Sequence, residues 1–175
     1  MSQPLVVGVL VGNPRVGSRT LRAAVGVGEA VRGALRALGH EVAGDGPLVD
    51  AAGLAGEVFA AGSGVVDEAL EALGRADYLV VASPTYKATY TGLLKAVLDR
   101  APGGWLRGRV AVPLLVAASD RHALAVELHL KPLLAELGAA VPGRGLFLND
   151  SALDQDPAAL LAEAGWFAAP VGVAS

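Results

Sequence analysis

The chain contains no cysteine, little aromatic surface and no cluster of basic residues. Without cysteine it has no disulfide framework, no thiol nucleophile and no thiolate metal site. Its formal net charge is −3, and without a concentrated positive field both nucleic acid and anionic membrane are disfavoured as partners. The three histidines are scattered and lack acidic companions, so we expect no metal site, and no Ser-His-Asp set suggests a hydrolase.

Apolar residues make up 53% of the 175 residues, and charged residues only 18%. This composition excludes a disordered chain, and the length predicts one domain over residues 1–175. Because aromatic residues are only 5%, the core is expected to consist mainly of Leu, Val and Ala. The first apolar run, Leu5–Val11, is too short for a membrane span or signal peptide and lacks a basic leader, so we expect a cytoplasmic protein.

Strand-like and helix-like segments alternate along the chain. Almost unbroken apolar runs that contain β-branched residues, such as Leu5–Val11, are typical of strands buried on both faces of a parallel sheet. Strands are expected at Leu5–Val11, His40–Ala43, Tyr78–Ala82, Val110–Ala117 and Leu146–Leu148. Helices are expected after the loop Gly12–Ser18 to about Leu38, at Val65–Gly74, Thr91–Arg100 and Arg121–Leu137, and from Asp156-Pro157 onward. The alternation predicts an α/β fold with a doubly wound, five-stranded parallel sheet in three α/β/α layers.

Local signals refine these elements. Gly39 is expected to end the first helix, whose apolar face is expected to hold Leu21, Val25, Gly28, Val31, Leu35 and Leu38. Residues 44–64 lack periodicity and are interpreted as a long surface connection. Pro132 removes a helical hydrogen bond to Leu128, which predicts a kink or π-bulge near Leu128–His129. Leu124 and Leu128 widen the apolar surface of this helix enough to predict contact with another subunit.

The loop after the first strand, Gly12–Thr20, combines hydroxyl donors, arginines and the start of a helix. Ser18 and Thr20 can donate hydrogen bonds, Arg15 and Arg19 add charge, and a helix N-terminus attracts anions, so the loop predicts a phosphate site. It is not a Walker A loop, because Ser18 stands where lysine is required, nor a Rossmann fingerprint. The alternative is that Ser18 only caps the helix and the arginines are solvated.

The loop after the third strand reads Ser83-Pro84-Thr85-Tyr86-Lys87. Pro84 stiffens it, Thr85 and Lys87 bring donors to the sheet edge, and Tyr86 offers a flat apolar wall. Such an arrangement suits a flavin ring. Ordinary packing of Tyr86 is the alternative.

Together, the two loops resemble those of the NADPH-dependent FMN reductase family within the flavodoxin-like fold. The resemblance is nearest to members that supply reduced flavin to two-component monooxygenases, such as the alkanesulfonate system. It covers nearly the whole chain and includes the motifs SPTYKATYTGLLKAVLD at Ser83–Asp99, HALAVELHLKPLLAEL at His122–Leu137, and Phe147–Asp150.

The resemblance implies NAD(P)H-dependent reduction of FMN, with NADPH or NADH as the donor and a partner monooxygenase as a possible recipient. It assigns the phosphate to Asn13, Arg15, Ser18, Arg19 and Thr20, and the isoalloxazine to Ser83, Pro84, Thr85, Tyr86 and Lys87, with Ser119 nearby. It assigns no catalytic acid or base. It also implies a homodimer or homotetramer formed through the helix at Arg121–Leu137.

One turn departs from the family pattern. Relatives tend to have a Gly-Gly-Thr turn after the fourth strand, where this chain has Ala117-Ala118-Ser119-Asp120. The added methyl groups and the carboxylate of Asp120 are expected to weaken the nicotinamide interaction. An FMN-bound quinone or azo reductase and a non-enzymatic flavin-binding protein therefore stay open as alternatives.

Overall fold

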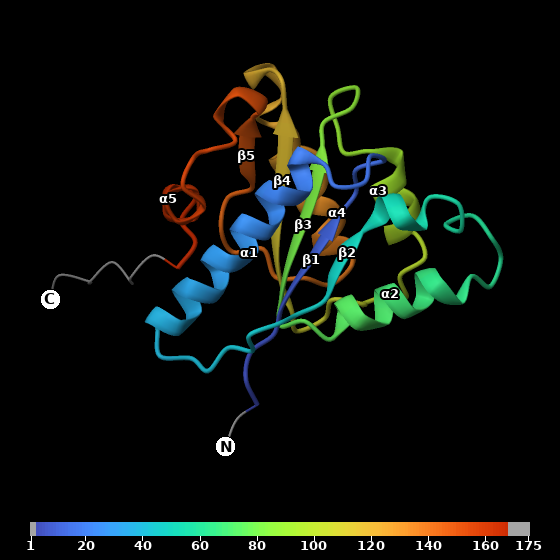
Figure 1. Cartoon of the computed structure of the whole chain (residues 1–175), viewed down its shortest axis with the longest axis horizontal. Coiled ribbons are helices and arrows are strands. Elements are labelled where there is room, and N and C mark those ends of the chain that lie inside the picture. The colour runs from blue at the N-terminus through green and yellow to red at the C-terminus, as the bar shows by residue number, and fades with distance from the viewer. Residues whose placement is uncertain (1–2, 168–175) are drawn as a thin grey trace, which may run out of the picture.

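Five parallel strands form the centre of the molecule in the computed structural model, which describes residues 3–167 (Figure 1). They are β1 (Val7–Val11), β2 (Leu48–Asp50), β3 (Tyr78–Pro84), β4 (Val110–Ala117) and β5 (Leu146–Asn149). Their order in the sheet is β2-β1-β3-β4-β5, and every neighbouring pair is parallel. The winding therefore reverses between β1 and β3, which is the flavodoxin-like arrangement predicted from the sequence.

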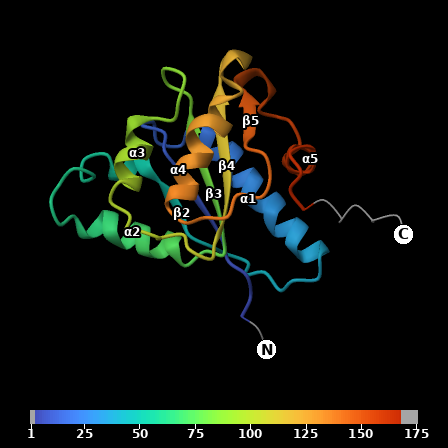
Figure 2. The same cartoon turned by 180° about the vertical axis from the view of Figure 1, so that it is seen from behind.

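Helices cover both faces of this sheet. They are α1 (Arg19–Ala37), α2 (Gly64–Gly74), α3 (Gly92–Leu98), α4 (Lys131–Glu136) and α5 (Pro157–Glu163). The helices α1 and α5 pack on one face, and α2, α3 and α4 lie on the other, as the two opposite views show (Figures 1 and 2). The three-layer prediction is confirmed.

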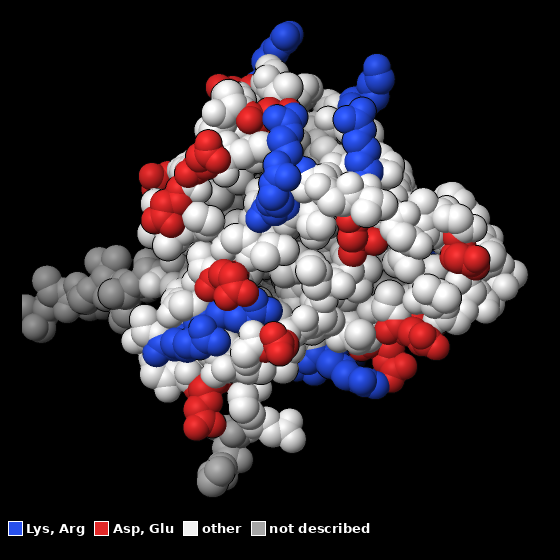
Figure 3. All heavy atoms as spheres, viewed as in Figure 1, with Lys and Arg blue, Asp and Glu red and all other residues white. Residues whose placement is uncertain are grey.

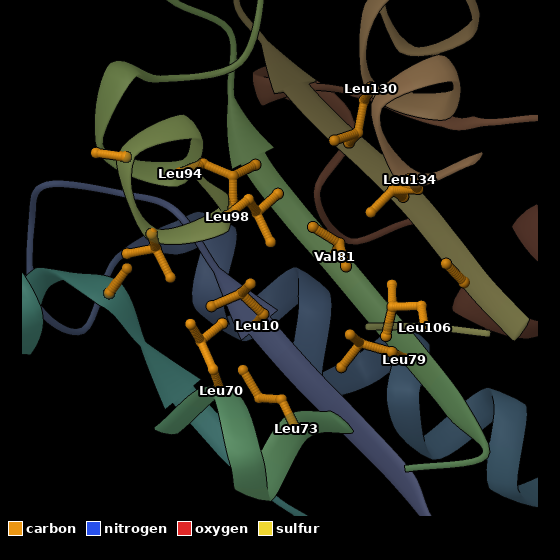
Figure 4. Packing of buried hydrophobic residues seen from close by; sticks show 14 of the residues in the cluster. Leu10, Leu70, Leu73, Leu79, Val81, Leu94, Leu98, Leu106, Leu130 and Leu134 are labelled. Atoms are coloured by element: carbon orange, nitrogen blue, oxygen red, sulfur yellow. The ribbon is translucent and has the colours of Figure 1, made fainter. Parts of the chain in front are cut away.

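The two faces of the sheet carry separate apolar cores. Along β1, Val9 and Val11 face α1 and α5, whereas Leu10 faces α2 and α3. The core between the sheet and the helices α2, α3 and α4 contains mostly leucines, among them Leu10, Leu79, Leu94 and Leu130 (Figure 4). Because all five residues of β1 are buried, its unbroken apolar run reflects burial on both faces.

The second strand was predicted at the wrong place. His40–Ala43 contributes only a single bridge, from Val42 to Leu5, and the strand lies instead at Leu48–Asp50. The connection predicted at residues 44–64 therefore contains β2 and a 3-10 turn, η1 (Ala51–Leu54). β2 is a short edge strand whose residues are exposed or half-buried, so it carries no long apolar run that would reveal it.

The helix predicted at Arg121–Leu137 is not continuous. It consists of a 3-10 turn, η2 (Asp120–His122), a π-helical segment, η3 (Val126–Leu130), and α4. The predicted irregularity near Leu128–His129 is confirmed, because η3 includes both residues and directly precedes the turn that contains Pro132.

Other local predictions were confirmed or corrected. Gly39 has a φ of 87°, as expected after a helix end, and Asp156 caps α5 with Pro157 in its first turn. The predicted face of α1 is partly right, since Gly28, Val31 and Leu35 are buried. Leu38 is exposed, and Ala24 and Val27, which were not predicted, are buried. Among the described helices, none is long and apolar enough to cross a membrane.

Candidate functional site

The loops that follow the strands gather at one edge of the sheet. In a parallel sheet all carboxyl ends lie at the same edge, toward which the arrowheads of β4 and β5 point in Figure 1. The loops after β1 and β3 flank the point at which the winding reverses, where ligands bind in open α/β sheets. The two segments predicted as a phosphate loop and a ring loop are therefore neighbours.

Two buried side chains brace the loop after β1. Asn13 donates from Nδ2 to Oγ1 of Thr20 over 3.2 Å, and its Oδ1 accepts from the backbone N–H of Arg15 over 2.9 Å. Asn13 and Thr20 are only 7% and 3% exposed. Their polar groups therefore support the loop from within, whereas Arg15 and Arg19 are exposed.

Ser18 caps α1. Its Oγ accepts a hydrogen bond from the backbone N–H of Leu21 over 3.1 Å, and its backbone is extended. The hydroxyl proton is not used by this bond. The first backbone N–H groups of α1, at Arg19 and Thr20, belong to the turn that has no intrahelical acceptor. These donors are of the kind that helix N-termini present to anions.

Two carboxylates that were not predicted as site residues contact the same loop. Asp50 Oδ2 accepts from the N–H of Gly17 over 3.2 Å, and Asp150 Oδ2 accepts from Nη2 of Arg19 over 3.1 Å. Asp50 ends β2 and Asp150 directly follows β5. The sequence could have indicated both acids, because each lies at the carboxyl end of a strand. Asp50 was missed because the second strand was predicted at His40–Ala43.

The loop after β3 contains a tight turn. The backbones of Tyr86 and Thr89 are hydrogen-bonded to one another, over 2.8 and 3.3 Å. Between them, Lys87 and Ala88 have φ values of 51° and 68°, which side-chain-bearing residues rarely adopt. Such conformations cluster at functional sites. In this turn, Tyr86 is 46% exposed at the sheet edge.

Thr85 and Ser83 have different surroundings in this loop. The N–H of Thr85 donates to the carbonyl of Val116 over 2.7 Å, while its buried Oγ1 has no hydrogen-bond partner in the described part of the chain. A buried polar atom of this kind calls for a partner, and the polar edge of a flavin ring supplies donors and acceptors. Ser83 is fully buried, and its hydroxyl bonds to the backbone of Thr91 and Pro84, so it supports the loop.

Thr91 joins the two loops. Its hydroxyl donates to the carbonyl of Gly12, which follows β1, and accepts from the N–H of Leu94 as the cap of α3. A Cβ on Gly12 would lie 2.3 Å from Cβ of Leu94, so only glycine permits this approach. Neither Thr91 nor Gly12 was predicted as a site residue, because their role depends on contact between distant segments.

The turn after β4, residues 117–120, is hydrogen-bonded to the last residue of β5. Asp120 Oδ1 accepts from Nδ2 of Asn149 over 2.7 Å, and Ser119 caps η2. Residues 117–120 are not among the described positions with positive φ, so alanine causes no backbone strain here. Ala117 and Ala118 therefore fit this turn without needing glycine.

A cavity of about 350 Å³ lies beside the first loop, between α1 and the connection from β5 to α5. Arg19 is the predicted site residue that lines it, next to Arg22 and Asp154. Its position on the α1–α5 face separates it from the loop after β3. Basic side chains, interspersed with acidic ones, project at the edge toward which the strands point (Figure 3).

Comparison with known proteins agrees with this geometry. The family model described as "NADPH-dependent FMN reductase" matches residues 5–154. The chain belongs to this family.

Curated relatives in the family include both nicotinamide preferences. The "FMN reductase (NADPH)" of Escherichia coli strain K12 is 46% identical over 81 residues, which are 46% of this chain and 42% of the relative. The "NADH-dependent FMN reductase SfnF" of Pseudomonas putida is 43% identical over 89 residues, 49% of this chain and 46% of the relative. The matches thus span less than half of the length of these relatives.

Two solved structures are similar to this chain over more of its length than the curated relatives are. An NADH:FMN oxidoreductase in its apo form has 30% sequence identity and a TM-score of 0.76, over 91% of this chain and 86% of that one. An oxidoreductase from Corynebacterium diphtheriae has 27% identity and a TM-score of 0.83, over 95% of this chain and 96% of that one.

Proposed function

We propose that this protein reduces FMN with NADPH or NADH. The observation that supports this proposal most strongly is the meeting of an anion-binding helix terminus and the Pro84-Thr85-Tyr86 loop at the switch point, joined by the bond from Thr91 to Gly12. Membership of the FMN reductase family agrees with it. Both donors are proposed because relatives named for each are similar to this chain.

The first loop would hold the FMN phosphate. Arg15, Ser18 and Arg19 present charge and a hydroxyl, and the first-turn amides of α1 point to the same end of the helix. Asn13 and Thr20 fix the shape of this loop through their mutual hydrogen bond. A terminal phosphate carries almost two negative charges, which suits this donor set.

The second loop would hold the ring. Thr85 Oγ1 would bond to its polar edge, Tyr86 and Pro84 would line its face, and Lys87 would extend from the strained turn. Ser83 keeps the loop in place, and Ser119 lies on the adjoining turn. Bound FMN supplies the hydride chemistry, so the protein needs to align the two cofactors and requires no acid–base residue.

The quaternary arrangement belongs to the same proposal. Leu124, just before the π-helical segment, and Leu128, within it, are 69% and 64% exposed, which favours a homodimer or homotetramer formed there. The proposal also includes a single domain over residues 1–175, a cytoplasmic location and the delivery of reduced flavin to a monooxygenase.

Flavin dependence of nicotinamide oxidation tests the proposal. Desalted protein should oxidise NADPH or NADH only when FMN is added, and the rate should saturate with FMN. If flavin stays bound through desalting and turnover needs a quinone or azo dye instead, the protein is an FMN-bound reductase of those acceptors. If FMN binds without any nicotinamide oxidation, the reductase proposal is wrong.

A further inference from the structure

Two acids hold donors of the loop that we assign to phosphate. Asp150 pairs with the guanidinium of Arg19 over 3.1 Å, and Asp50 accepts from the N–H of Gly17 over 3.2 Å. Asp150 follows β5 and Asp50 ends β2, and these are the two outer strands of the sheet, so the two acids approach the loop from opposite sides. Each carboxylate therefore accepts a hydrogen bond from a group that could otherwise donate to an anion at the N-terminus of α1.

These contacts are poorly suited to a purely structural role. The side chains of Arg19 and Asp150 are 59% and 33% exposed, and an ion pair so open to water contributes little to folding stability. The bond from Asp50 to Gly17 is exposed as well. The loop already has an internal brace in the buried Asn13–Thr20 pair.

A phosphate bound by this loop would compete with the two carboxylates for Arg19 and Gly17. The carboxylate charges would also repel a dianion held by the same donors, because salt screens incompletely at such short range. We propose that Asp50 and Asp150 weaken the hold of the loop on FMN, so that flavin exchanges as a substrate. This inference rests on the proposed function, since it assumes that the loop binds the FMN phosphate.

Asp150→Asn separates charge from positioning. Asparagine keeps an oxygen that can accept from Arg19 but removes the negative charge. We expect the variant to bind FMN about three- to tenfold more tightly and to release it more slowly, because one repulsive charge near the phosphate is lost. The affinity for riboflavin, which has no phosphate, should not change. Flavin fluorescence titration and stopped-flow displacement measure these quantities.

Two control variants complete the experiment. Asp150→Glu keeps the charge and should bind FMN as the wild type does. Asp154→Asn removes a charge from an exposed residue that lines the cavity with Arg19. It should have a smaller effect than Asp150→Asn. Asp50→Asn, added to Asp150→Asn, should tighten FMN binding further; its folding is checked by thermal unfolding, since Asp50 also accepts from Ala52.

Several results would overturn the inference. Weaker FMN binding by Asp150→Asn would mean that the carboxylate orients Arg19 productively, and unchanged binding would mean that it has no influence. An equal gain for riboflavin would exclude the phosphate as the cause. If the wild type binds FMN no better than riboflavin, the phosphate assignment itself fails, which is a different outcome from an unaffected Asp150 variant.

Discussion

At the scale of single residues, the helix cap formed by Ser18 can be separated from the phosphate contact that we propose for it. Its Oγ caps α1 through the N–H of Leu21, and its hydroxyl proton would bond to phosphate. Ser18→Ala should therefore lower the free energy of unfolding by about 1 kcal/mol. It should also weaken FMN binding about 10-fold or more, because a hydrogen bond to a charged group is lost.

A second cap provides the control for this variant. Asp156 also caps a helix, α5, through the N–H of Ala158, and it is not among the residues that line the cavity beside the first loop. Asp156→Ala should lose similar stability in urea unfolding and keep its FMN affinity. If the two variants bind FMN equally well, Ser18 is only a cap.

The residues that the sequence predicted correctly depend on local rules. Caps such as Ser18 and Asp156 and the glycine at position 39 are recognised from neighbours within a few positions. Thr91, Asp50 and Asp150 were missed as members of the site because their partners lie 33 to 131 positions away in the chain. Only the sheet order brings them together.

At the scale of elements, the contact between β1 and α3 determines how the two loops meet. Gly12→Ala would place a Cβ 2.3 Å from Cβ and 2.9 Å from Cα of Leu94, and backbone cannot move aside easily. We expect a loss of about 1–3 kcal/mol in the free energy of unfolding, as for other overpacked sites. FMN affinity should fall too, since the bond from Thr91 to Gly12 is displaced.

Gly92→Ala is the matched control in the same region. A Cβ at Gly92, the first residue of α3, meets nothing within 4 Å. Urea unfolding should show unchanged or slightly higher stability, because alanine is the better helix former. Equal losses in both variants would contradict the packing argument.

Elements were predictable in proportion to their burial. β1, β3 and β4 are long and buried on both faces, so their apolar runs identify them. β2 is three residues long at the sheet edge and has no such run. The irregularity near Leu128–His129 could be predicted because Pro132 lacks the N–H that would bond to the carbonyl of Leu128, whatever the fold.

At the scale of the whole molecule, assembly should depend on the exposed leucines at the π-helical segment, Leu124 and Leu128. Leu128→Glu would place a charge in an apolar contact, and we expect the variant to form smaller species than the wild type. Light scattering measures the size of the wild type and of the variant. Leu38, after the end of α1, is also an exposed leucine, and Leu38→Glu should leave the assembly unchanged. A wild-type monomer at tens of micromolar would refute the interface.

The most direct test of flavin reduction is a single turnover without oxygen. The protein is loaded with FMN and mixed with NADPH or with NADH, and the visible absorbance of the flavin is followed against a free-FMN control. Our account predicts that at least one nicotinamide bleaches the bound flavin much faster than the free flavin. Bound FMN that neither nicotinamide bleaches faster than the control would contradict it.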